Sequence, residues 1–139
     1  MRSDAEYLNL LTRKLFHSGF NKPLVDRKWP AFEEVFCGFD PARVAAFDEA
    51  DVARLRADAR IVRHRLKIRA TIANAGHFVE MAASHGSWGR WLDSLGALSY
   101  AERASRLQAR LTHCGPNTVF YFLYEAGEAA SADKPAKVR

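Results

Sequence analysis

Cationic side chains are concentrated between Arg54 and Arg69, which makes this stretch the first candidate for a binding surface. Against one acid, Asp58, it holds seven cations: Arg54, Arg56, Arg60, Arg63, Arg65, Lys67 and Arg69. Guanidinium and ammonium groups bind the phosphates of a nucleic-acid backbone and release its counterions. A solvated helix face has the same composition. The segment therefore predicts either an exposed basic helix or a phosphate-binding surface, with Arg63, Arg65 and Lys67 as candidate DNA contacts.

A second candidate surface lies around Gly115, where two predicted helices meet in a tight turn. Residues 111–115 connect them, and Pro116 suits the first turn of the second helix. The N-terminus of a helix presents backbone N–H groups and the positive end of the helix dipole, which bind phosphate without a charged side chain. An ordinary corner between two helices is the alternative. In the phosphate-binding interpretation the DNA contacts are His113, Gly115, Pro116, Asn117 and Thr118.

Known catalytic and metal-binding motifs are not found in the sequence. There is no glycine-rich phosphate loop, no serine nucleophile elbow and no cluster of metal ligands. Cys37 and Cys114 form no CxxC pair, and the five histidines do not have the spacing of zinc ligands. Two reduced cysteines in a cytoplasmic protein are the favoured interpretation, and a long-range disulfide is the alternative. We therefore predict neither a metal nor another cofactor.

The elements that must position these residues are predicted to be helices. Ser3 to Glu6 and Ser99 to Glu102 have the form of capping boxes, in which a serine and a glutamate accept hydrogen bonds from each other's backbone N–H groups. Pro23 and Pro30 each suit the first turn of a helix. The longest helical periodicity extends from about Arg60 to Ala83.

Only between Val119 and Tyr124 does a strand compete with a helix, because the residues of this stretch prefer strands. Pro116 before it and Gly127 after it favour a buried helix. We therefore predict an all-α fold of about eight helices. Residues 1–127 are expected to form a single helical domain, and residues 128–139 a flexible C-terminal tail.

The composition agrees with one globular domain. Of the 139 residues, 48% are hydrophobic and 12% aromatic, which supplies an apolar core. No apolar stretch approaches the ~18 residues of a membrane span, and the acidic, amphipathic start differs from a signal peptide. Lys and Arg number 21 against 16 Asp and Glu, giving a net charge of +5 that suits a polyanionic partner. We expect a cytoplasmic protein with no membrane association.

The order of residues in the central part of the chain resembles the DNA-3-methyladenine glycosylase I family, which belongs to the helix-hairpin-helix DNA glycosylases. The resemblance covers roughly residues 7–127. It is carried by residues 38–45, 51–55, 61–68 and 72–75, and by the turn at 114–118 with Gly127 beyond it.

The resemblance implies an all-α, helix-hairpin-helix glycosylase-like bundle that flips an alkylated purine out of double-stranded DNA and hydrolyses its N-glycosidic bond. Alkylation at N3 makes the base a cationic leaving group, so a pocket that binds the flipped base supplies much of the rate. Enzymes of this superfamily that also cut the backbone carry a lysine two positions after the hairpin glycine. Asn117 occupies that position here, so we expect a monofunctional enzyme, acting as a monomer.

The chain departs from the family at its ends and in its base pocket. It begins too late to hold the family's N-terminal zinc-binding segment, and residues 130–132 replace an Asn-Asp-His segment. By this resemblance the base pocket contains Lys14, Phe16, His17 and Lys22. Lys14 aligns with an acidic base-contacting residue and Lys22 with a stacking tryptophan, and either cation would repel a positively charged base. The catalytic residue is unidentified, with Asp133 as the one candidate carboxylate.

Three functions remain open at this point. The first is a metal-independent glycosylase for 3-methyladenine-like purines. The second is a non-catalytic DNA-binding relative with a degraded base pocket. The third is a helical domain whose basic surface binds an acidic protein. A basic hollow containing Lys14, Lys22 and the hairpin would favour the first, and a filled cleft would leave only binding.

Overall fold

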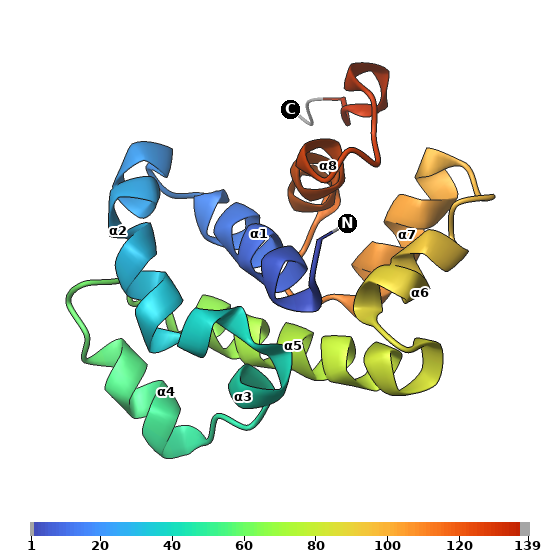
Figure 1. Cartoon of the computed structure of the whole chain (residues 1–139). Coiled ribbons are helices and arrows are strands. Elements are labelled where there is room, and N and C mark those ends of the chain that lie inside the picture. The colour runs from blue at the N-terminus through green and yellow to red at the C-terminus, as the bar shows by residue number, and fades with distance from the viewer. Residues whose placement is uncertain (1, 137–139) are drawn as a thin grey trace.

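The chain folds into helices throughout the part that the structure describes, residues 2–136 of the computed structural model (Figure 1). Within it there are eight α-helices and no strand: α1 Asp4–His17, α2 Lys22–Val35, α3 Pro41–Ala45, α4 Glu49–Arg56, α5 Arg65–His85, α6 Trp88–Ser94, α7 Tyr100–Arg110 and α8 Pro116–Glu125. Two short 3-10 turns lie at Cys37–Phe39 and Ser131–Asp133. This confirms the predicted all-α fold of about eight helices.

Helix α5 is the longest element, and the others are arranged around it (Figure 1). It contacts α1, α3, α4 and α6, while α1 also packs against α2 and α8. Aromatic side chains fill much of the space between them: Trp88 stacks on Phe78 with ring centroids 4.2 Å apart, and Phe16 meets Phe32 edge to face at 4.8 Å. Such pairs add to the stabilisation that comes from burying their area.

Local signals in the sequence explain where several helices begin. The Glu6 backbone N–H donates to Ser3 Oγ at 3.1 Å, and the Ser3 N–H donates to Glu6 Oε1 at 2.9 Å, which completes the predicted capping box. Ser99 also caps α7, accepting from the Glu102 N–H at 3.2 Å, but the predicted capping box is not completed, because Glu102 Oε1 accepts from the Ser99 hydroxyl at 3.1 Å instead of from its N–H. A serine cap contributes about 1 kcal/mol. The stretch from Val119 to Tyr124 is helical, within α8, as predicted.

Two expectations about helix boundaries are wrong. Pro30 does not begin a helix but lies inside α2. A buried stripe that includes Val25, Trp29 and Phe32 runs past it, and this burial offsets the hydrogen bond that proline cannot donate. The helix predicted from about residue 60 begins instead at Arg65, so the basic stretch 54–69 is divided by a loop between α4 and α5.

Residues 128–136 cover most of the predicted tail, and several make defined contacts. The Glu128 N–H donates to the Leu123 carbonyl at 2.7 Å, and the Glu128 carboxylate pairs with Arg103 at 3.3 Å. Residues 137–139 of that tail lie outside the described residues. None of the helices within residues 2–136 has the length and apolar content that a membrane crossing requires.

Candidate functional site

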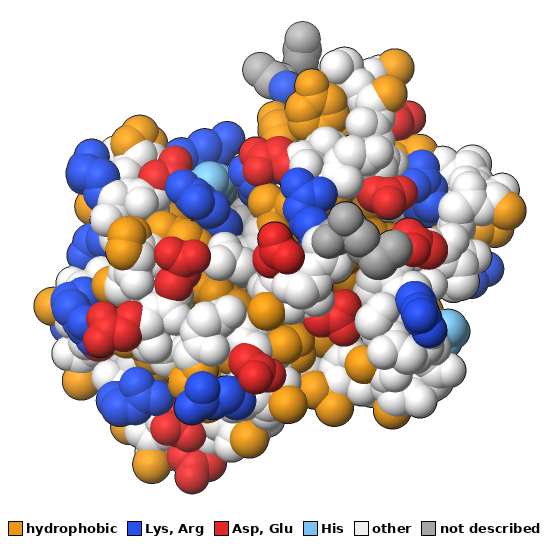
Figure 2. All heavy atoms as spheres, viewed as in Figure 1, with side chains coloured by type: hydrophobic (Ala, Val, Ile, Leu, Met, Phe, Trp, Pro, Cys, Tyr) orange, Lys and Arg blue, Asp and Glu red, His pale blue; other side chains and the backbone are white. Residues whose placement is uncertain are grey.

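A hollow of about 460 Å³ opens between the C-terminal part of α1, the start of α2 and one side of α8. Its walls carry Lys14, His17, Lys22, Asp26, Tyr121 and Glu125, and Asn117 and Thr118 at the start of α8 complete its rim. A second hollow of about 440 Å³ continues along α1 and shares Lys14, His17, Asp26 and Glu125 with the first. These volumes fall in the range of small-molecule sites, about 300–1,000 Å³. Basic side chains gather over the α1 and α2 end of this face (Figure 2).

The α1 wall is fixed from beneath by Lys67 of α5. Its ammonium donates to the Leu15 carbonyl at 2.7 Å and also to the Ser18 carbonyl, at the negative end of the α1 dipole. The residue is only 8% exposed, and burial lowers the pKa of its ammonium. The prediction that Lys67 contacts DNA is therefore wrong, because its charge is used inside the protein to hold the turn that borders the hollow.

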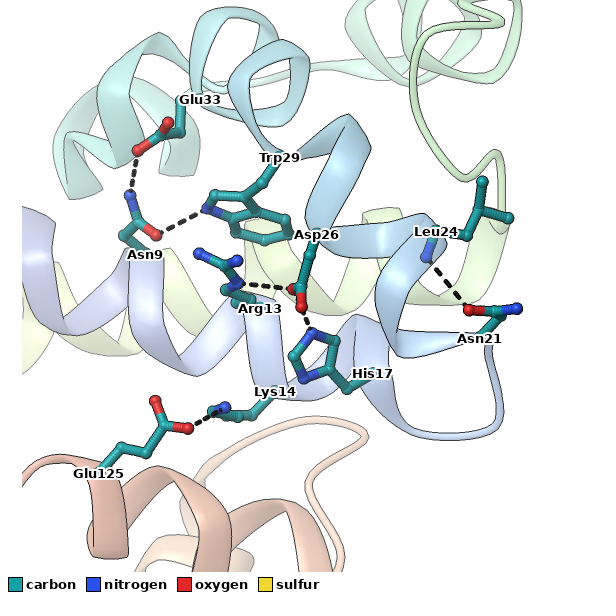
Figure 3. A network of polar contacts seen from close by, with 10 residues as sticks. All are labelled: Asn9, Arg13, Lys14, His17, Asn21, Leu24, Asp26, Trp29, Glu33 and Glu125. Atoms are coloured by element: carbon teal, nitrogen blue, oxygen red, sulfur yellow. Dashed lines mark hydrogen bonds and ion pairs between the residues drawn. The ribbon is translucent and has the colours of Figure 1, made fainter.

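The two hollows form one groove, and Asp26 of α2 lies where they meet. It joins the side chains of Arg13 and His17 on α1 (Figure 3). Its Oδ1 accepts from Arg13 Nε at 2.9 Å and lies 2.7 Å from His17 Nε2. Although burial opposes the effect, the hydrogen bonds from His17 and Arg13 hold the pKa of Asp26 below its usual value. Burial lowers the pKa of His17 and outweighs the opposing influence of Asp26. At neutral pH the pair is therefore a carboxylate beside a neutral imidazole.

Each lysine of the hollow has a partner. Lys14 forms an ion pair with Glu125, which extends from the last turn of α8 on the opposite wall (Figure 3). Lys22 Nζ lies 5.1 Å from the centre of the Tyr121 ring, within the range of a cation–π contact. The hollow thus presents carboxylates, cations and one aromatic ring, a set suited to a flat, polar, aromatic ligand.

The hairpin between α7 and α8 presents its turn to solvent beside the hollow. Gly115 occupies the N-cap position of α8 but has no side chain, so no side-chain hydrogen bond caps this helix. Gly115, Pro116 and Asn117 are exposed, whereas Thr118 is buried. The N–H groups of Asn117 and Thr118 have no hydrogen-bond partner within residues 2–136. Backbone N–H groups at the positive end of a helix dipole are donors of the kind that bind anions.

Asn74 of α5 holds this hairpin in place. Its Oδ1 accepts from the Thr112 N–H at 2.7 Å, and its Nδ2 donates to the Thr112 carbonyl at 3.2 Å. The same amide contacts the sulfur of Cys114 at 3.8 Å. Burial raises the pKa of the Cys114 thiol to about 12, so this cysteine is an inert part of the turn. The sequence signal for this contact is an asparagine within the apolar stripe of a long helix.

The structure brings together part of the predicted site. Lys14, His17 and Lys22 share one hollow with Asn117 and Thr118. Phe16 does not line it, because its side chain is fully buried against Phe32 in the core. The assignment of Phe16 to the base pocket is therefore wrong.

Other predicted residues lie around or away from the hollow. Arg63, in the loop before α5, and Arg65, the first residue of α5, are exposed and do not line it. His113 is exposed in the turn with a φ of 57°, in the left-handed region. Asp133 accepts from the Ala130 N–H at 2.8 Å, within its own 3-10 turn. No pattern in the sequence points to Tyr121 or to the carboxylates of Asp26 and Glu125, which join the site only when the helices pack together.

Comparison with known proteins relates this arrangement to a family. The family model described as methyladenine glycosylase matches residues 1–119. The chain belongs to the methyladenine glycosylase family.

Individual relatives agree with this assignment. DNA-3-methyladenine glycosylase 1 of Escherichia coli (strain K12) is 44% identical over 64 residues, which cover 46% of this chain and 34% of that protein. The match thus spans about a third of the length of the curated relative. The structure of 3-methyladenine DNA glycosylase I from Staphylococcus aureus is similar with a TM-score of 0.81 and 26% identity, covering 99% of this chain and 86% of the other. A variant of 3-methyladenine DNA glycosylase I in complex with 3-methyladenine has a TM-score of 0.79 and 28% identity, covering 94% and 83%.

The zinc site that the family resemblance implies does not fit the residues described here. Within residues 2–136 no three His, Cys, Asp or Glu side chains are grouped so that they could hold a metal ion.

Proposed function

We propose that this chain removes alkylated purines from double-stranded DNA as a monofunctional, monomeric glycosylase of the 3-methyladenine type. The observation that supports this best is the position of the hollow, which adjoins the uncapped start of α8. A phosphate bound by the N–H groups of Asn117 and Thr118 would place the duplex beside the hollow. A nucleotide rotated out of the helix then has a site to enter.

The side chains of the hollow suit a cationic base in spite of its lysines. Glu125 neutralises Lys14, and Asp26 adds a second carboxylate on the same groove. Tyr121 offers a ring against which a base can stack. Selective binding of the cationic form accounts for a preference for alkylated bases, and the alkylation itself makes the purine a good leaving group because it departs as a neutral base. Asn117 supplies no amine for a Schiff base, so the product is an intact abasic site.

The second candidate is a DNA-binding relative without glycosylase activity. Lys14 favours this candidate. Its side chain lines the groove and is 11% exposed, and its ammonium group repels a positively charged base. Such a protein would bind DNA with a steep dependence on salt and would not prefer damaged or abasic DNA.

Release of methylated purines from alkylated duplex DNA tests the proposal. The purified, folded chain is expected to release 3-methylated purines above the buffer background and to leave the DNA strand uncut. Absence of release from a folded sample would reject glycosylase activity. Salt-sensitive binding without a preference for abasic DNA would then establish the second candidate.

We also propose that the protein acts in the cytoplasm as one domain over residues 1–127. Cys37 and Cys114 are free in the structure, which supports a reducing compartment.

A further inference from the structure

The last residue of α1, His17, lines both hollows and meets Asp26 of α2 at their junction. We infer that His17 is the general base that activates the attacking water, and that Asp26 orients it. The inference rests on the proposed function, since it assigns a catalytic residue to the same site.

The hydrogen bond to Asp26 determines which ring nitrogen is free. An ionised carboxylate only accepts hydrogen bonds, so the contact of 2.7 Å requires a proton on His17 Nε2. The lone pair then lies on Nδ1. Within the part of the chain that the structure describes, Nδ1 makes no hydrogen bond. In Figure 3 this nitrogen is turned away from Asp26, toward the side on which Lys14 and Glu125 lie.

Asp26 is itself held in place, which makes it suitable for orienting the imidazole. Arg13 Nε donates to the same carboxylate oxygen at 2.9 Å. The Arg13 guanidinium lies 5.5 Å from the centre of the Trp29 ring. The Trp29 N–H in turn donates to Asn9 at 2.9 Å. A base whose partner is fixed in this way has the arrangement that activates nucleophiles in other hydrolases.

The charges around His17 keep its imidazole neutral at neutral pH. The charged groups that line the two hollows with it are Arg2, Glu6, Arg13, Lys14, Lys22, Asp26 and Glu125. From α5, Lys67 reaches the carbonyl group of the next residue, Ser18. Burial is the largest influence and lowers the pKa of His17, the cations at Lys14 and Arg13 lower it further, and Asp26 opposes them. A neutral imidazole is the form that accepts a proton.

The proposed step balances in atoms and charge. The water oxygen bonds to C1′ of the flipped nucleotide as the bond from C1′ to the purine nitrogen breaks. The electron pair of that bond passes to the base and cancels its positive charge. The water proton passes to His17 Nδ1, and the imidazolium forms beside the Asp26 carboxylate, which stabilises it. The proton is then returned to solvent.

Single-turnover release of methylated purine from alkylated duplex DNA, measured between pH 5 and 8, tests this role. We expect H17Q to be about 100-fold slower than the wild type, as for loss of a general base, while its Kd for the duplex changes less than about twofold. The wild-type rate should fall about tenfold per pH unit below the His17 pKa, and H17Q should lack this acid limb. H85Q is the matched control, since His85 is exposed at the end of α5 and does not line the hollow.

A second variant tests the pair even where H17Q does not fold. D26N keeps an oxygen that accepts from Nε2 but loses the charge that raises the His17 pKa. Its acid limb should therefore move to lower pH. If the wild type is active and D26N or folded H17Q has the same acid limb, the role of His17 is overturned and the proposed function still stands. A wild type that releases no purine would refute the proposed function itself.

Discussion

Replacing Gly115 with valine separates the hairpin's role in DNA binding from its role in stability. Gly115 has φ −79° and ψ −175°, an extended conformation that any residue adopts, and no atom lies within 4 Å of an added Cβ. An apolar residue at the N-cap costs the folded state up to about 1 kcal/mol. Replacing glycine also lowers the conformational entropy of the unfolded chain, which stabilises the folded state by about 0.4–1 kcal/mol. The free energy of unfolding should therefore change by less than about 1 kcal/mol.

The effect of G115V on DNA binding should be much larger. Its methyl groups would occupy the space through which a phosphate reaches the N–H groups of Asn117 and Thr118. A hydrogen bond to a charged group contributes about 1.5–3 kcal/mol. Loss of one strong or two weaker contacts, about 3 kcal/mol, corresponds to roughly a 100-fold rise in Kd.

Fluorescence anisotropy with a duplex that carries an abasic-site analogue measures this change, at one fixed salt concentration because affinity depends on salt. G76A is the matched control. Gly76 also has open space around an added Cβ but lies inside α5. This variant should gain about 0.5–1 kcal/mol in stability and keep its Kd. A folded G115V protein that binds the duplex as tightly as the wild type would refute the phosphate-binding assignment of the hairpin.

Three further predictions concern the groove and the core. Asn74→Ala removes two hydrogen bonds that hold the hairpin turn. It should lower the free energy of unfolding, measured in urea, by about 1–3 kcal/mol and weaken DNA binding at equal folded fraction. If neither the stability nor the Kd changes, Asn74 does not hold the turn. Burial lowers the pKa values of both His77 and His17, so the unfolded chain binds protons first as the pH falls below about 6.5. Stability should be constant above that pH and decrease below it, and a melting temperature equal at pH 7.5 and pH 5.5 would contradict this. Lys14→Gln removes a positive charge from the groove and should speed release of a cationic purine roughly tenfold, whereas Glu125→Gln should slow it by a similar factor. Single-turnover rates measure both effects. Rates that change in the same direction in the two variants would exclude a charge effect.

Most of the fold was predictable because its signals are local. Capping boxes such as that of Ser3 and the apolar periodicity of α5 act within one or two helical turns, and both appear in the structure. Pro30 shows the limit of this reasoning, since its position inside α2 is decided by buried neighbours such as Trp29 rather than by its own backbone preference.

The site was predictable only in part, because its charges meet across elements. Lys14 and His17 lie on α1, and the resemblance to the family was enough to select them. Asp26 and Glu125 become their partners only when α2 and α8 pack against α1, and no spacing in the sequence links these pairs. Counting cations also misplaced Lys67, because a count does not tell a solvated ammonium from one bound to buried carbonyl groups.

The corrected position of Lys67 explains how one helix arranges both walls of the hollow. Lys67 and Asn74 are seven residues apart on α5, about two helical turns, so both side chains extend from the same face. Lys67 holds the carbonyl groups at the end of α1, and Asn74 holds the turn before α8. The distance between the hairpin turn and the hollow is therefore set by a single rigid element. The central run of residues that most resembles the glycosylases thus acts from inside the protein, where it fixes the two surfaces that are proposed to meet DNA.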